Sequence, residues 1–450
     1  MPMKMRYWNE EAETMSRDKL AALQLERLQK TLRLVYAKVP FYRQLFEQAG
    51  LKPESLKSLE DLAKFPFTKK TDLRENYPFG LFAEPPEKLV RLHASSGTRG
   101  KPTVVGYTRQ DIANWSECMA RSLVAAGAQP GDVIHNAYGY GLFTGGLGVH
   151  YGAEAMGACV VPISGGNTPR QIMLLQDFGA RILTCTPSYA LNIAEAIEEQ
   201  KIPRESIKLE YGIFGAEPWT EEMRAQLESR LNLKGAMDIY GLSEVMGPGV
   251  AMECVGGSKG LTIWTDHFYP EVIDPVSGQP LPYGEMGELV FSTLTKEGFP
   301  LIRYRTGDLC TLYNDPCPTG RTHVRMGKLK GRTDDMLIIR GVNVFPSEIE
   351  RVLLTFQELA PYYQIIMERP GALDLVSVEV EVTPQYHASR FESDETFQPD
   401  HHELYSLRQQ IGQKLNSALG INLDIRFNAP HKVARSEGKA VRVVDRRPKL

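Results

Sequence analysis

Residues 133–138 (VIHNAY), 159–163 (CVVPI) and 182–187 (ILTCTP) decide the fold, because each is a short β-branched run of strand length. Stretches in which apolar residues recur at helical spacing alternate with these runs, notably RQDIANWSECMARSLVAAGA at 109–128 and PSYALNIAEAIEEQ at 187–200. This alternation predicts an α/β fold with a largely parallel sheet.

The segments on either side add a helix and a β-rich region. Apolar residues recur at helical spacing over 18–40, and Pro40 ends the run. From 259 to 326 the chain changes to short strands separated by turns, and DPVSGQPLPYGE at 274–285 is typical of a hairpin. We therefore expect a β-rich subdomain beside the parallel sheet.

A second domain is expected beyond residue 330. The stretch MGKLKGRTDDMLIIRG at 326–341 is polar and flanked by glycine, and a new apolar strand follows it. The remaining chain holds two further strand patterns and one helix pattern, enough for a small α+β domain. The predicted division is a large N-terminal domain over 1–330 and a small, mobile C-terminal domain over 331–450. The predicted elements of the second domain are strands at 373–382 and 423–427 and a helix at 403–420.

The composition is that of an ordinary globular chain of 450 residues, with 42% hydrophobic and 24% charged residues. The chain has 52 basic and 55 acidic residues, and the resulting net charge of −3 gives no electrostatic reason to bind nucleic acid or an anionic membrane. The sequence has no apolar window of about 18 residues, and its charged start lacks the apolar core of a secretory signal. Six cysteines are too few for a disulfide framework, so we expect a reduced, cytoplasmic protein.

A phosphate-binding loop is predicted at 95–102, SSGTRGKP. Glycines let backbone N–H groups approach an anion, and the hydroxyls and cations add further donors. The loop is not of the Walker A kind, because only Thr98 and Arg99 separate its glycines where that motif needs four residues. An ordinary glycine-rich turn would have the same composition.

Four further stretches carry groups suited to a nucleotide. Aspartate oxygens accept from ribose hydroxyls, arginine pairs with phosphate, lysine is a compact cation, and a glutamate can hold Mg²⁺ against phosphate oxygens. Each stretch alone is also compatible with a solvated turn. The stretches are YGLSE at 240–244 (preceded by FGAEP at 214–218), RYRTGDL at 303–309, GRTDD at 331–335 and RSEGKA at 435–440.

In this order the five stretches resemble the core motifs of the adenylate-forming superfamily over residues 90–445, and most of all those of the phenylacetate–CoA ligase family. The closer resemblance includes AYGYGLFTGGLGVHYGAE at 137–154, YGLSEVMGPG at 240–249, WTDHFYPEVID at 264–274 and GRTDDMLIIRGVNVFPSEIE at 331–350. It implies an enzyme that activates a carboxylate with ATP to an acyl-adenylate and then passes the acyl group to coenzyme A.

The resemblance also implies a nucleotide site, residue by residue. Asp308 would accept from both ribose hydroxyls, and Arg332 would support the same region. The loop over the β- and γ-phosphates would consist of Ser95, Ser96, Gly97, Thr98, Gly100 and Lys101. The adenine would lie against Gly215, Ala216, Glu217, Pro218, Asp238, Ile239 and Tyr240, with Gly241 and Ser243 in the same ATP-binding set.

The resemblance implies catalytic roles for Glu244 and Lys439. Glu244 would hold Mg²⁺, and Lys439 would bridge the substrate carboxylate and the α-phosphate during adenylation. These cations would offset the repulsion between a carboxylate and a triphosphate. Asp334 is at the position of the family's hinge, about which the C-terminal domain would turn before thioester formation. The expected ligands are ATP, Mg²⁺, coenzyme A and a small acid.

The acyl pocket is predicted within the aromatic and glycine-rich stretch 138–148. Aromatic side chains could pack an aryl ring for which the glycines leave room, although core aromatics of an α/β domain would look the same. Phenylacetate is the first expectation, and other arylacetates, indoleacetate and benzoate analogues stay open. The predicted pocket residues are Tyr138, Tyr140, Phe143, Gly145 and Gly146.

A structural zinc site is a further expectation. Cys254, Cys310, Cys317 and His323 fall within one β-rich segment, and cysteine and histidine are the usual zinc ligands, although no CxxC spacing is present. The PCPTGRTH stretch also resembles a cysteine-bearing stretch in anaerobic-type members of the family. His267 is an alternative ligand to His323. The other cysteines, Cys118, Cys159 and Cys185, are expected in the core.

Three classes of function compete at this point. The first is an acyl-CoA ligase. The second is an adenylating enzyme that loads a carrier protein, for which a fused carrier domain would be the sign, and none follows Leu450. The third is a non-catalytic nucleotide-binding protein, which would be expected to have lost one of Glu244, Asp308, Arg332 or Lys439. A homodimer is also possible, through the apolar face of the N-terminal helix.

Overall fold

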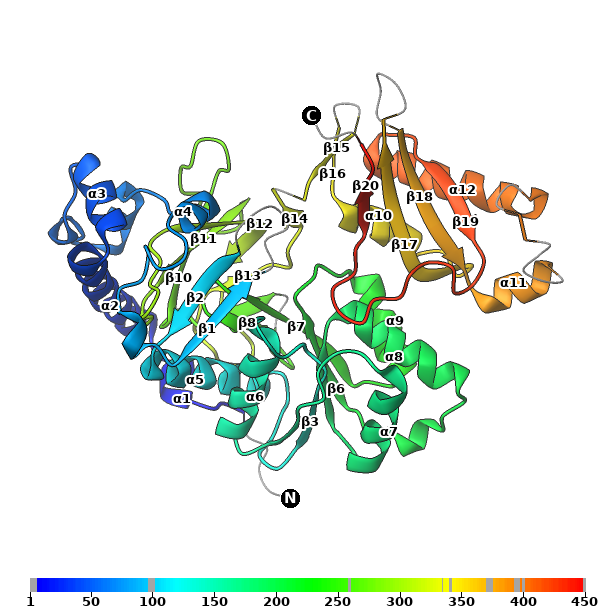
Figure 1. The fold of residues 1–450 in the computed structure, drawn as a ribbon, viewed down its shortest axis with the longest axis horizontal. Coiled ribbons are helices and arrows are strands. Elements are labelled where there is room, and N and C mark those ends of the chain that lie inside the picture. Colours follow the sequence, from blue (N-terminus) through cyan, green and yellow to red (C-terminus); the bar gives the residue numbers. More distant parts are fainter. Residues whose placement is uncertain are drawn as a thin grey trace.

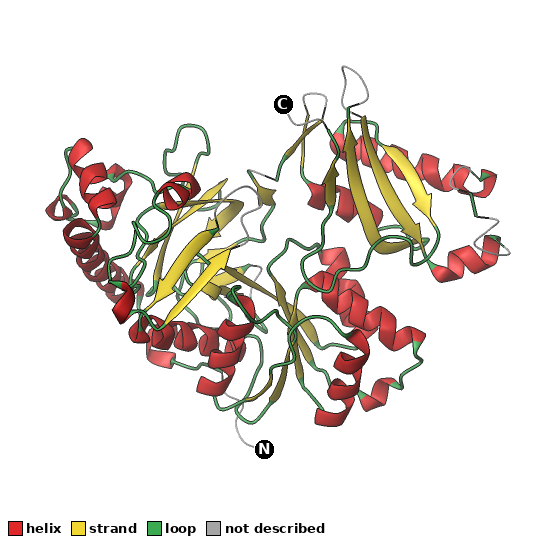
Figure 2. Cartoon of the chain, viewed as in Figure 1, coloured by secondary structure: helices red, strands yellow, loops and turns green. Residues whose placement is uncertain are grey.

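The computed structural model describes residues 6–95, 102–257, 260–333, 335–339, 342–369, 375–391, 397–398 and 401–447. A large N-terminal part is joined to a smaller C-terminal part, which lies at the upper right of the view in Figure 1. Figure 2 shows that both parts combine helices with sheets, as the α/β prediction requires. Within the described residues no helix has both the length and the apolar composition to cross a bilayer.

The main sheet has a parallel half. Strands β3 (Val133–Asn136), β4 (Cys159–Val161), β5 (Ile182–Cys185), β6 (Tyr211–Gly215) and β7 (Gly235–Leu242) pair in the order β4-β3-β5-β6-β7, all in parallel. The three β-branched runs of the sequence are thus neighbouring parallel strands, as predicted.

The same sheet continues as an antiparallel half. The β-rich region that the sequence predicts as a subdomain beside the parallel sheet is therefore part of that sheet. From β7 the order runs β8-β9-β13-β12-β11-β10, and β14 pairs with β12. The sheet as a whole is therefore mixed. The strands of this half are β8 (Gly247–Glu253), β9 (Leu261–Ile263), β10 (Phe268–Ile273), β11 (Met286–Thr293), β12 (Tyr304–Tyr313), β13 (Arg325–Met326) and β14 (Gly331–Arg332). A separate hairpin pairs β1 (Arg91–Ser95) with β2 (Thr103–Tyr107).

Helices cover both faces of the parallel half. Neighbouring residues of one strand point to opposite faces: Ile182 and Ile213 join the core that contains the side chains of α5 and α6, whereas Leu183 and Phe214 join the core under α7–α9. Figure 1 shows the two helix layers on either side of the strands. The helices are α5 (Arg109–Ala125), α6 (Gly145–Ala155), α7 (Thr168–Phe178), α8 (Pro187–Glu199) and α9 (Glu221–Leu231).

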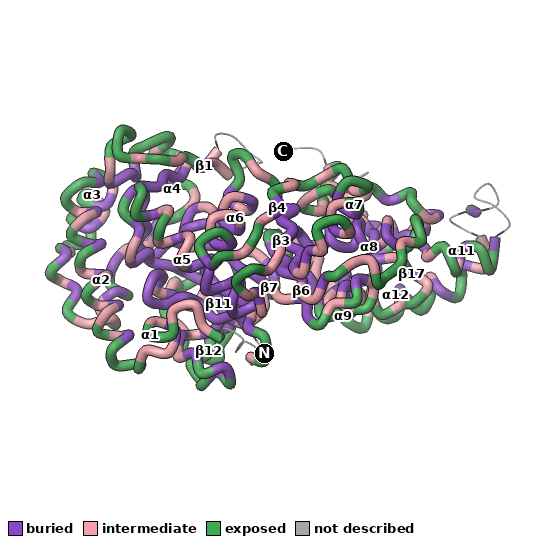
Figure 3. Tube along the Cα trace, turned by 90° about the horizontal axis from the view of Figure 1, so that it is seen from below, coloured by how far each residue is buried: buried purple, intermediate pink, exposed green. Residues whose placement is uncertain are grey.

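The N-terminal helices pack on the antiparallel half. In α2 (Arg17–Lys38) the buried residues Leu20, Leu28, Leu32 and Val35 lie on one face, as the helical spacing predicted. Because this apolar face is already buried within the chain, it cannot also supply the dimer contact suggested from sequence. Figure 3 shows buried residues in purple along the central strands and α5, and exposed ones in green on the outer helices. The other helices of this region are α1 (Glu10–Glu13), α3 (Pro40–Gln48) and α4 (Lys70–Glu75).

The C-terminal part has a core of its own, whose buried members all lie between Ile339 and Ala429. A four-stranded sheet of order β19-β18-β17-β20 carries helices at its side, and a two-stranded hairpin precedes it. The predicted small α+β C-terminal domain is thus confirmed, whereas its boundary at 330/331 stays a prediction. The elements are β15 (Leu337–Ile339), β16 (Val342–Val344), α10 (Pro346–Leu353), β17 (Leu359–Glu368), β18 (Leu375–Val382), α11 (Pro384–Arg390), α12 (Tyr405–Leu419), β19 (Asp424–Asn428) and β20 (Val443–Asp445).

Candidate active site

A cavity of about 610 Å³ lies where the parallel strands end. Its wall includes Tyr138 just after β3, Thr186 just after β5 and Ala216 just after β6, together with Ile239 near the end of β7. Ligands of open α/β sheets bind at these carboxyl ends, because loops from several strands converge there. The cavity is therefore the candidate active site.

A second cavity of about 190 Å³ adjoins the first, and the two share wall residues, including Arg332 and Lys439. Most of the predicted adenine set lines this smaller cavity, namely Ala216, Glu217, Pro218, Asp238, Ile239 and Tyr240. Gly241, predicted as part of the wider ATP-binding set, lines it as well. Gly215 lies at the end of β6 and does not line it. A Cβ at Gly215 would come within 2.3 Å of the Ile239 carbonyl oxygen, so this glycine is needed for the close approach of β6 to β7.

Asp308 is the buried acceptor at the far side of the smaller cavity. The Tyr240 hydroxyl donates to Asp308 Oδ2 at 2.6 Å, and Arg332 Nη1 donates to Oδ1 at 2.8 Å. Burial, and then the charge of Asp308, raises the pKa of Tyr240 well above its usual value, so the hydroxyl stays a donor. The two contacts hold the carboxylate in the wall, and they join three separate motifs, since Asp308 is 68 positions from Tyr240 and 24 from Arg332.

Asp238 is another carboxyl group in the wall of the smaller cavity, beside Glu217 and Asp308. Burial raises its pKa to about 6, against the opposing charge of Lys328 and a hydrogen bond from Trp219. Its backbone N–H donates to Glu253 Oε2 at 2.9 Å.

Glu244 and Ser243 lie in the turn that follows β7, and both line the larger cavity. The side chain of Glu244 is buried, and among the described residues it has no ion-pair partner. The Ser243 hydroxyl is 3.1 Å from that of Thr144, at the entrance of α6. Within the described part of the chain, the predicted catalytic glutamate is thus a buried acid in the wall of the site without an ion-pair partner.

Lys439 reaches the same place from the C-terminal part, and it lines both cavities. Its loop is fastened on each side: Thr186 Oγ1 donates to the Gly438 carbonyl at 2.8 Å, and the Ala440 N–H donates to Glu217 Oε2 at 2.8 Å. Glu217 Oε1 accepts from the Ser188 N–H at 2.7 Å, so both carboxylate oxygens of Glu217 bind backbone groups. Glu217, which was predicted to contact the adenine, therefore also positions the loop that carries Lys439.

Arg435 is a second link between the two parts of the chain. Its guanidinium makes paired contacts of 2.7–2.8 Å with Glu195 of α8 and with Glu381 of β18. It also stacks over the Tyr362 ring, with Cζ 3.5 Å from the centroid. The contacts stabilise the orientation in which Lys439 points into the site.

Several site residues were missed from the sequence. Lys70, Thr186 and Glu437 line the larger cavity, as does the loop 164–166. Thr186 follows the β-branched run ILTC directly, and a hydroxyl at the end of a parallel strand is a signal that would have found it. Lys70 lies on α4, far from every motif, and no local pattern predicts its position.

Most residues of the predicted phosphate loop and the predicted hinge residue lie outside the part of the chain that the structure describes. Ser95 ends β1 and lines the larger cavity. The predicted loop residues Ser96, Gly97, Thr98, Gly100 and Lys101, and the predicted hinge Asp334, lie outside the described residues.

The predicted acyl-pocket residues divide into two groups. Tyr138, Phe143 and Gly145 line the larger cavity, but Tyr140 and Gly146 do not. Instead, Asn136 Nδ2 donates to the Tyr140 hydroxyl at 2.7 Å and to the Gly146 carbonyl at 2.8 Å. Tyr140 and Gly146 thus hold the loop that carries Phe143, which corrects the sequence-based assignment.

The predicted zinc set does not assemble. Among the four donors Cys254, Cys310, Cys317 and His323, no three lie within 4.8 Å of one another. Both ring nitrogens of His323 are engaged, Nδ1 by the Thr265 N–H at 2.9 Å and Nε2 by the Ala12 carbonyl at 2.9 Å. The thiols of Cys254 and Cys317 each contact a hydroxyl instead, those of Thr262 at 3.4 Å and Thr319 at 3.1 Å. The described geometry gives this site no support.

The remaining cysteines also differ from expectation. Cys118 and Cys185 are buried, as predicted, whereas Cys159 at the start of β4 is exposed. Strand β4 is the edge of the parallel half, where only one neighbour covers it. None of the six cysteines, all of which are described, forms a disulfide.

Comparison with known families places the chain in one class. The model of the AMP-binding enzyme family matches residues 14–295, and that of the AMP-binding enzyme C-terminal domain matches residues 341–447. The chain belongs to the AMP-binding enzyme family, the class that the fold and the two joined cavities define.

Curated relatives resemble the chain over nearly its full length. A phenylacetate–coenzyme A ligase of Thermus thermophilus is 54% identical over 97% of this chain and 99% of its own. A phenylacetate–coenzyme A ligase of Escherichia coli K12 is 53% identical, with 97% of both chains covered. Within the family, the chain groups with these ligases, as the sequence motifs indicated.

Solved structures of 2-hydroxyisobutyryl-CoA ligase resemble the chain as well. The structure in the postadenylation state, in complex with an acyl-AMP, is 31% identical and gives a TM-score of 0.90, with 99% of this chain and 93% of the other covered. The structure in the thioesterification state, with coenzyme A, is 32% identical. Its TM-score is only 0.72, with 99% of this chain and 94% of the other covered. The arrangement of the two parts here is thus closer to that of the postadenylation state.

Proposed function

We propose that this protein activates phenylacetate with ATP to phenylacetyl-AMP and pyrophosphate, and then transfers the acyl group to coenzyme A. The observation that carries the proposal is the convergence of Glu244, Lys439 and the Asp308–Arg332 pair on two joined cavities. The curated phenylacetate–coenzyme A ligases that share more than half of its residues support the same reaction.

We place the nucleotide across both cavities. The adenine lies in the smaller one, against Ala216, Ile239 and Tyr240, while Asp308 accepts from the ribose hydroxyls. The phosphates extend into the larger cavity toward Ser95, the described residue of the predicted phosphate loop.

Glu244 is the residue proposed to hold Mg²⁺. A buried carboxylate without an ion-pair partner in the described structure, in a cavity that would also receive phosphate oxygens, fits the preference of Mg²⁺ for few carboxylates plus phosphate and water. When bound, the ion would supply positive charge to the phosphate oxygens. No other role in the reaction is assigned to it.

Lys439 is proposed to act on the reacting groups themselves. The substrate carboxylate is ionised at neutral pH and needs no general base, so it attacks the α-phosphorus directly. Charge accumulates on the phosphoryl oxygens as pyrophosphate departs, and the ammonium of Lys439 stabilises it. Because the lysine loop rests on Thr186 and Glu217, the ammonium is held in place before the reaction begins.

The acyl end of the substrate is proposed to occupy the part of the larger cavity lined by Tyr138, Phe143 and Gly145. Aromatic side chains pack well against an aryl ring, and the glycine leaves room for it. Transfer to coenzyme A would require the C-terminal part to turn and withdraw Lys439. Asp334 keeps its predicted role as the hinge for this motion.

The proposal is tested with a panel of acids. Pyrophosphate release and thioester formation are measured for phenylacetate, indoleacetate, benzoate and aliphatic acids, with and without coenzyme A. Phenylacetate is expected to give the highest kcat/KM and a thioester only when coenzyme A is present. Pyrophosphate release without transfer to coenzyme A would instead favour an enzyme that loads a carrier protein.

Phe143→Ala is expected to relax the choice of acid. Phe143 lines the cavity but is itself 53% exposed, so its removal should cost little stability. The loss of the ring should reduce the preference for phenylacetate over smaller acids by roughly 1–3 kcal/mol in kcat/KM. The neighbouring Leu142, which is 66% exposed and does not line the cavity, provides the control Leu142→Ala. Equal acid preference in both variants would remove Phe143 from the acyl pocket.

Arg435→Ala is expected to slow adenylation more than transfer. In the arrangement described here, the guanidinium joins Glu195 of the N-terminal part to Glu381 of the C-terminal part, and a turn of the C-terminal part would separate the two carboxylates. Losing charged hydrogen bonds worth about 1.5–3 kcal/mol should lower the population of that arrangement by about tenfold or more. Single-turnover rates of each half-reaction check the result. The control is Arg446→Ala, because Arg446 pairs with Glu368 within the C-terminal part alone. If both half-reactions slow equally, Arg435 does not select the arrangement.

A cytoplasmic location and a homodimer remain proposals. Six cysteines without a disulfide suit a reducing compartment. Sedimentation of the purified protein would determine the oligomeric state. The apolar face of α2 is buried within the chain and so gives no reason to expect a dimer.

A further inference from the structure

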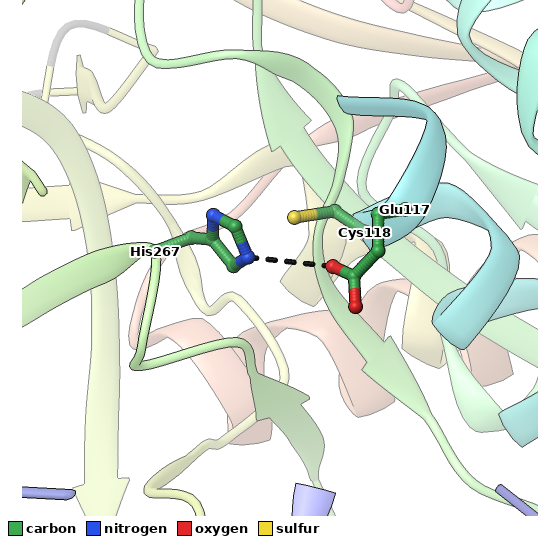
Figure 4. Close-up of side chains that lie close together, drawn as sticks. All are labelled: Glu117, Cys118 and His267. Atoms are coloured by element: carbon green, nitrogen blue, oxygen red, sulfur yellow. Dashed lines mark ion pairs between the residues drawn. The ribbon is translucent and has the colours of Figure 1, made fainter. Parts of the chain in front are cut away.

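Three potential metal ligands lie together between α5 and the segment before β10, and none of them lines the active-site cavities. Glu117, Cys118 and His267 each offer one donor atom, and these atoms all lie within 4.8 Å of one another. In Figure 4 the carboxylate and the thiol, both from α5, point toward the imidazole on the facing segment. The cluster is largely enclosed, since Cys118 is 0% and His267 6% exposed.

The imidazole of His267 is already oriented as a ligand. Its Nδ1 lies 2.7 Å from the Thr295 hydroxyl, which can accept the Nδ1 proton. The other nitrogen, Nε2, faces carboxylates, with Glu117 Oε2 at 3.3 Å and Asp266 Oδ2 at 3.4 Å. A metal-binding histidine commonly donates one N–H to a neighbouring group, which leaves the second nitrogen free to bind the ion.

The spacing of the donors is close to that of a tetrahedral zinc site. Bonds of about 2.0–2.3 Å place the ligand atoms of such a site about 3.3–3.8 Å apart. The distances from His267 Nε2 to Glu117 and to Asp266 already fall in this range. The Cys118 sulfur, which is within 4.8 Å of the other donors, needs to move by only about 1 Å.

A divalent ion would offset negative charge that lies buried in the cluster. A Cys118 thiolate and the carboxylates of Glu117 and Asp266 carry three negative charges. Arg121 supplies one positive charge, with Nη1 and Nη2 donating to the two Asp266 oxygens at 2.9 and 3.1 Å. A divalent ion offsets the other two negative charges, while Arg27, whose Nη1 is 3.8 Å from Asp266 Oδ2, adds a positive charge at the partly exposed edge of the cluster. Sulfur, nitrogen and oxygen together select a borderline ion such as Zn²⁺ over Mg²⁺ or Ca²⁺.

A cavity of about 280 Å³ borders the cluster, and its wall includes Asn9, Asn114, Glu117, Asp266 and His267. It gives space for a water molecule as the fourth ligand if Asp266 stays on Arg121. The N-terminal segment closes one side, because Asn9 Nδ2 donates to Glu117 Oε1 at 3.1 Å. An ion here would join α5 to the segment before β10, and Asn9, the N-cap residue of α1, contacts its Glu117 ligand.

We propose that Glu117, Cys118 and His267 bind one zinc-class divalent ion, with Asp266 or water as the fourth ligand. The ion serves as a structural cross-link in the N-terminal part and takes no part in the reaction at the active site.

Metal analysis of the purified full-length protein tests the proposal. After incubation with Zn²⁺ and desalting, the unaltered protein is expected to retain about one equivalent of zinc, and Cys118→Ser less than about a fifth of that. Cys185→Ser, which removes an equally buried thiol from β5, should retain zinc as the unaltered protein does. No retained zinc, or equal zinc in Cys118→Ser, overturns the proposal.

A second measurement does not depend on the folding of Cys118→Ser. Cobalt(II) exchanged into the otherwise unaltered protein should give a thiolate-to-cobalt charge-transfer band in the near ultraviolet. The same band should persist when Cys254 and Cys317, which lie in the other thiol-bearing region, are both replaced by serine. Absence of the band in the unaltered protein, or its loss in the Cys254→Ser, Cys317→Ser variant, excludes Cys118 as the ligand.

Discussion

Lys439→Ala is expected to abolish adenylation and to leave thioester formation from preformed acyl-adenylate largely intact. Lys439 lines both cavities and is the cation that the C-terminal part brings to the reacting groups. Removing one preorganised charge from a developing anion costs about 10²–10³-fold in rate. Pyrophosphate release and single-turnover transfer from synthetic phenylacetyl-AMP measure the two half-reactions separately.

Lys432→Ala is the matched control for Lys439. Lys432 is exposed in the same C-terminal stretch and lines neither cavity, so both half-reactions should be unchanged. A Lys439→Ala enzyme that loses both half-reactions to the same extent would show that the lysine does not act in adenylation alone. Unchanged adenylation would remove it from the reaction entirely.

Asp308→Ala is expected to raise the KM for ATP by about 10²-fold or more, since a charged acceptor contributes about 1.5–3 kcal/mol to each hydrogen bond. The carboxylate is 2% exposed and is held by Tyr240 and Arg332 beside the smaller cavity. Its loss removes the proposed acceptor for the ribose and leaves the Arg332 guanidinium without this partner. Steady-state kinetics with varied ATP, together with nucleotide binding by calorimetry, measure the effect.

Two controls separate ribose binding from damage to the fold. Asp308→Asn keeps one carbonyl acceptor in nearly the same shape, so its KM for ATP should lie between those of the unaltered enzyme and the alanine variant. Asp315→Ala removes an aspartate with a 60% exposed side chain that pairs with Arg325, and it should leave ATP binding unchanged. An Asp308→Ala enzyme with normal ATP binding and normal thermal stability would refute the ribose role.

The sequence predicted the parallel half of the fold for a local reason. Residues 133–138, 159–163 and 182–187 carry strand-length β-branched runs, and side chains alternate along each strand whatever the rest of the chain does. They became β3, β4 and β5, with residues on opposite faces in two different cores. The antiparallel strands were also expected, but their continuity with the parallel half depends on long-range pairing, which no local pattern encodes.

The polar motifs of the site were likewise visible in the sequence, because their residue types are set by the chemistry of a nucleotide. Glu244, Asp308, Arg332 and Lys439 all line one of the two joined cavities or touch a residue that does. Tyr140 and Gly146 are an aromatic residue and a glycine like those of the cavity wall, but they do not line the cavity. Asn136 binds both of them, and only the fold brings it there.

The cysteines show most clearly where sequence reasoning ends. Cys254, Cys310, Cys317 and His323 are close in the chain, yet their donors do not converge. Cys118 and His267 are 149 positions apart in the numbering and nevertheless lie together, because α5 packs against the segment before β10.

The sequence by itself determined the fold class, the order of the nucleotide motifs and the identity of the charged groups. These features depend on residue type and short spacing. The tertiary structure alone decided which side chains share a cavity, how Glu217 and Thr186 fasten the Lys439 loop, and which thiol meets a histidine. Such contacts join distant residues, and their geometry follows from the packing of whole elements rather than from any local pattern.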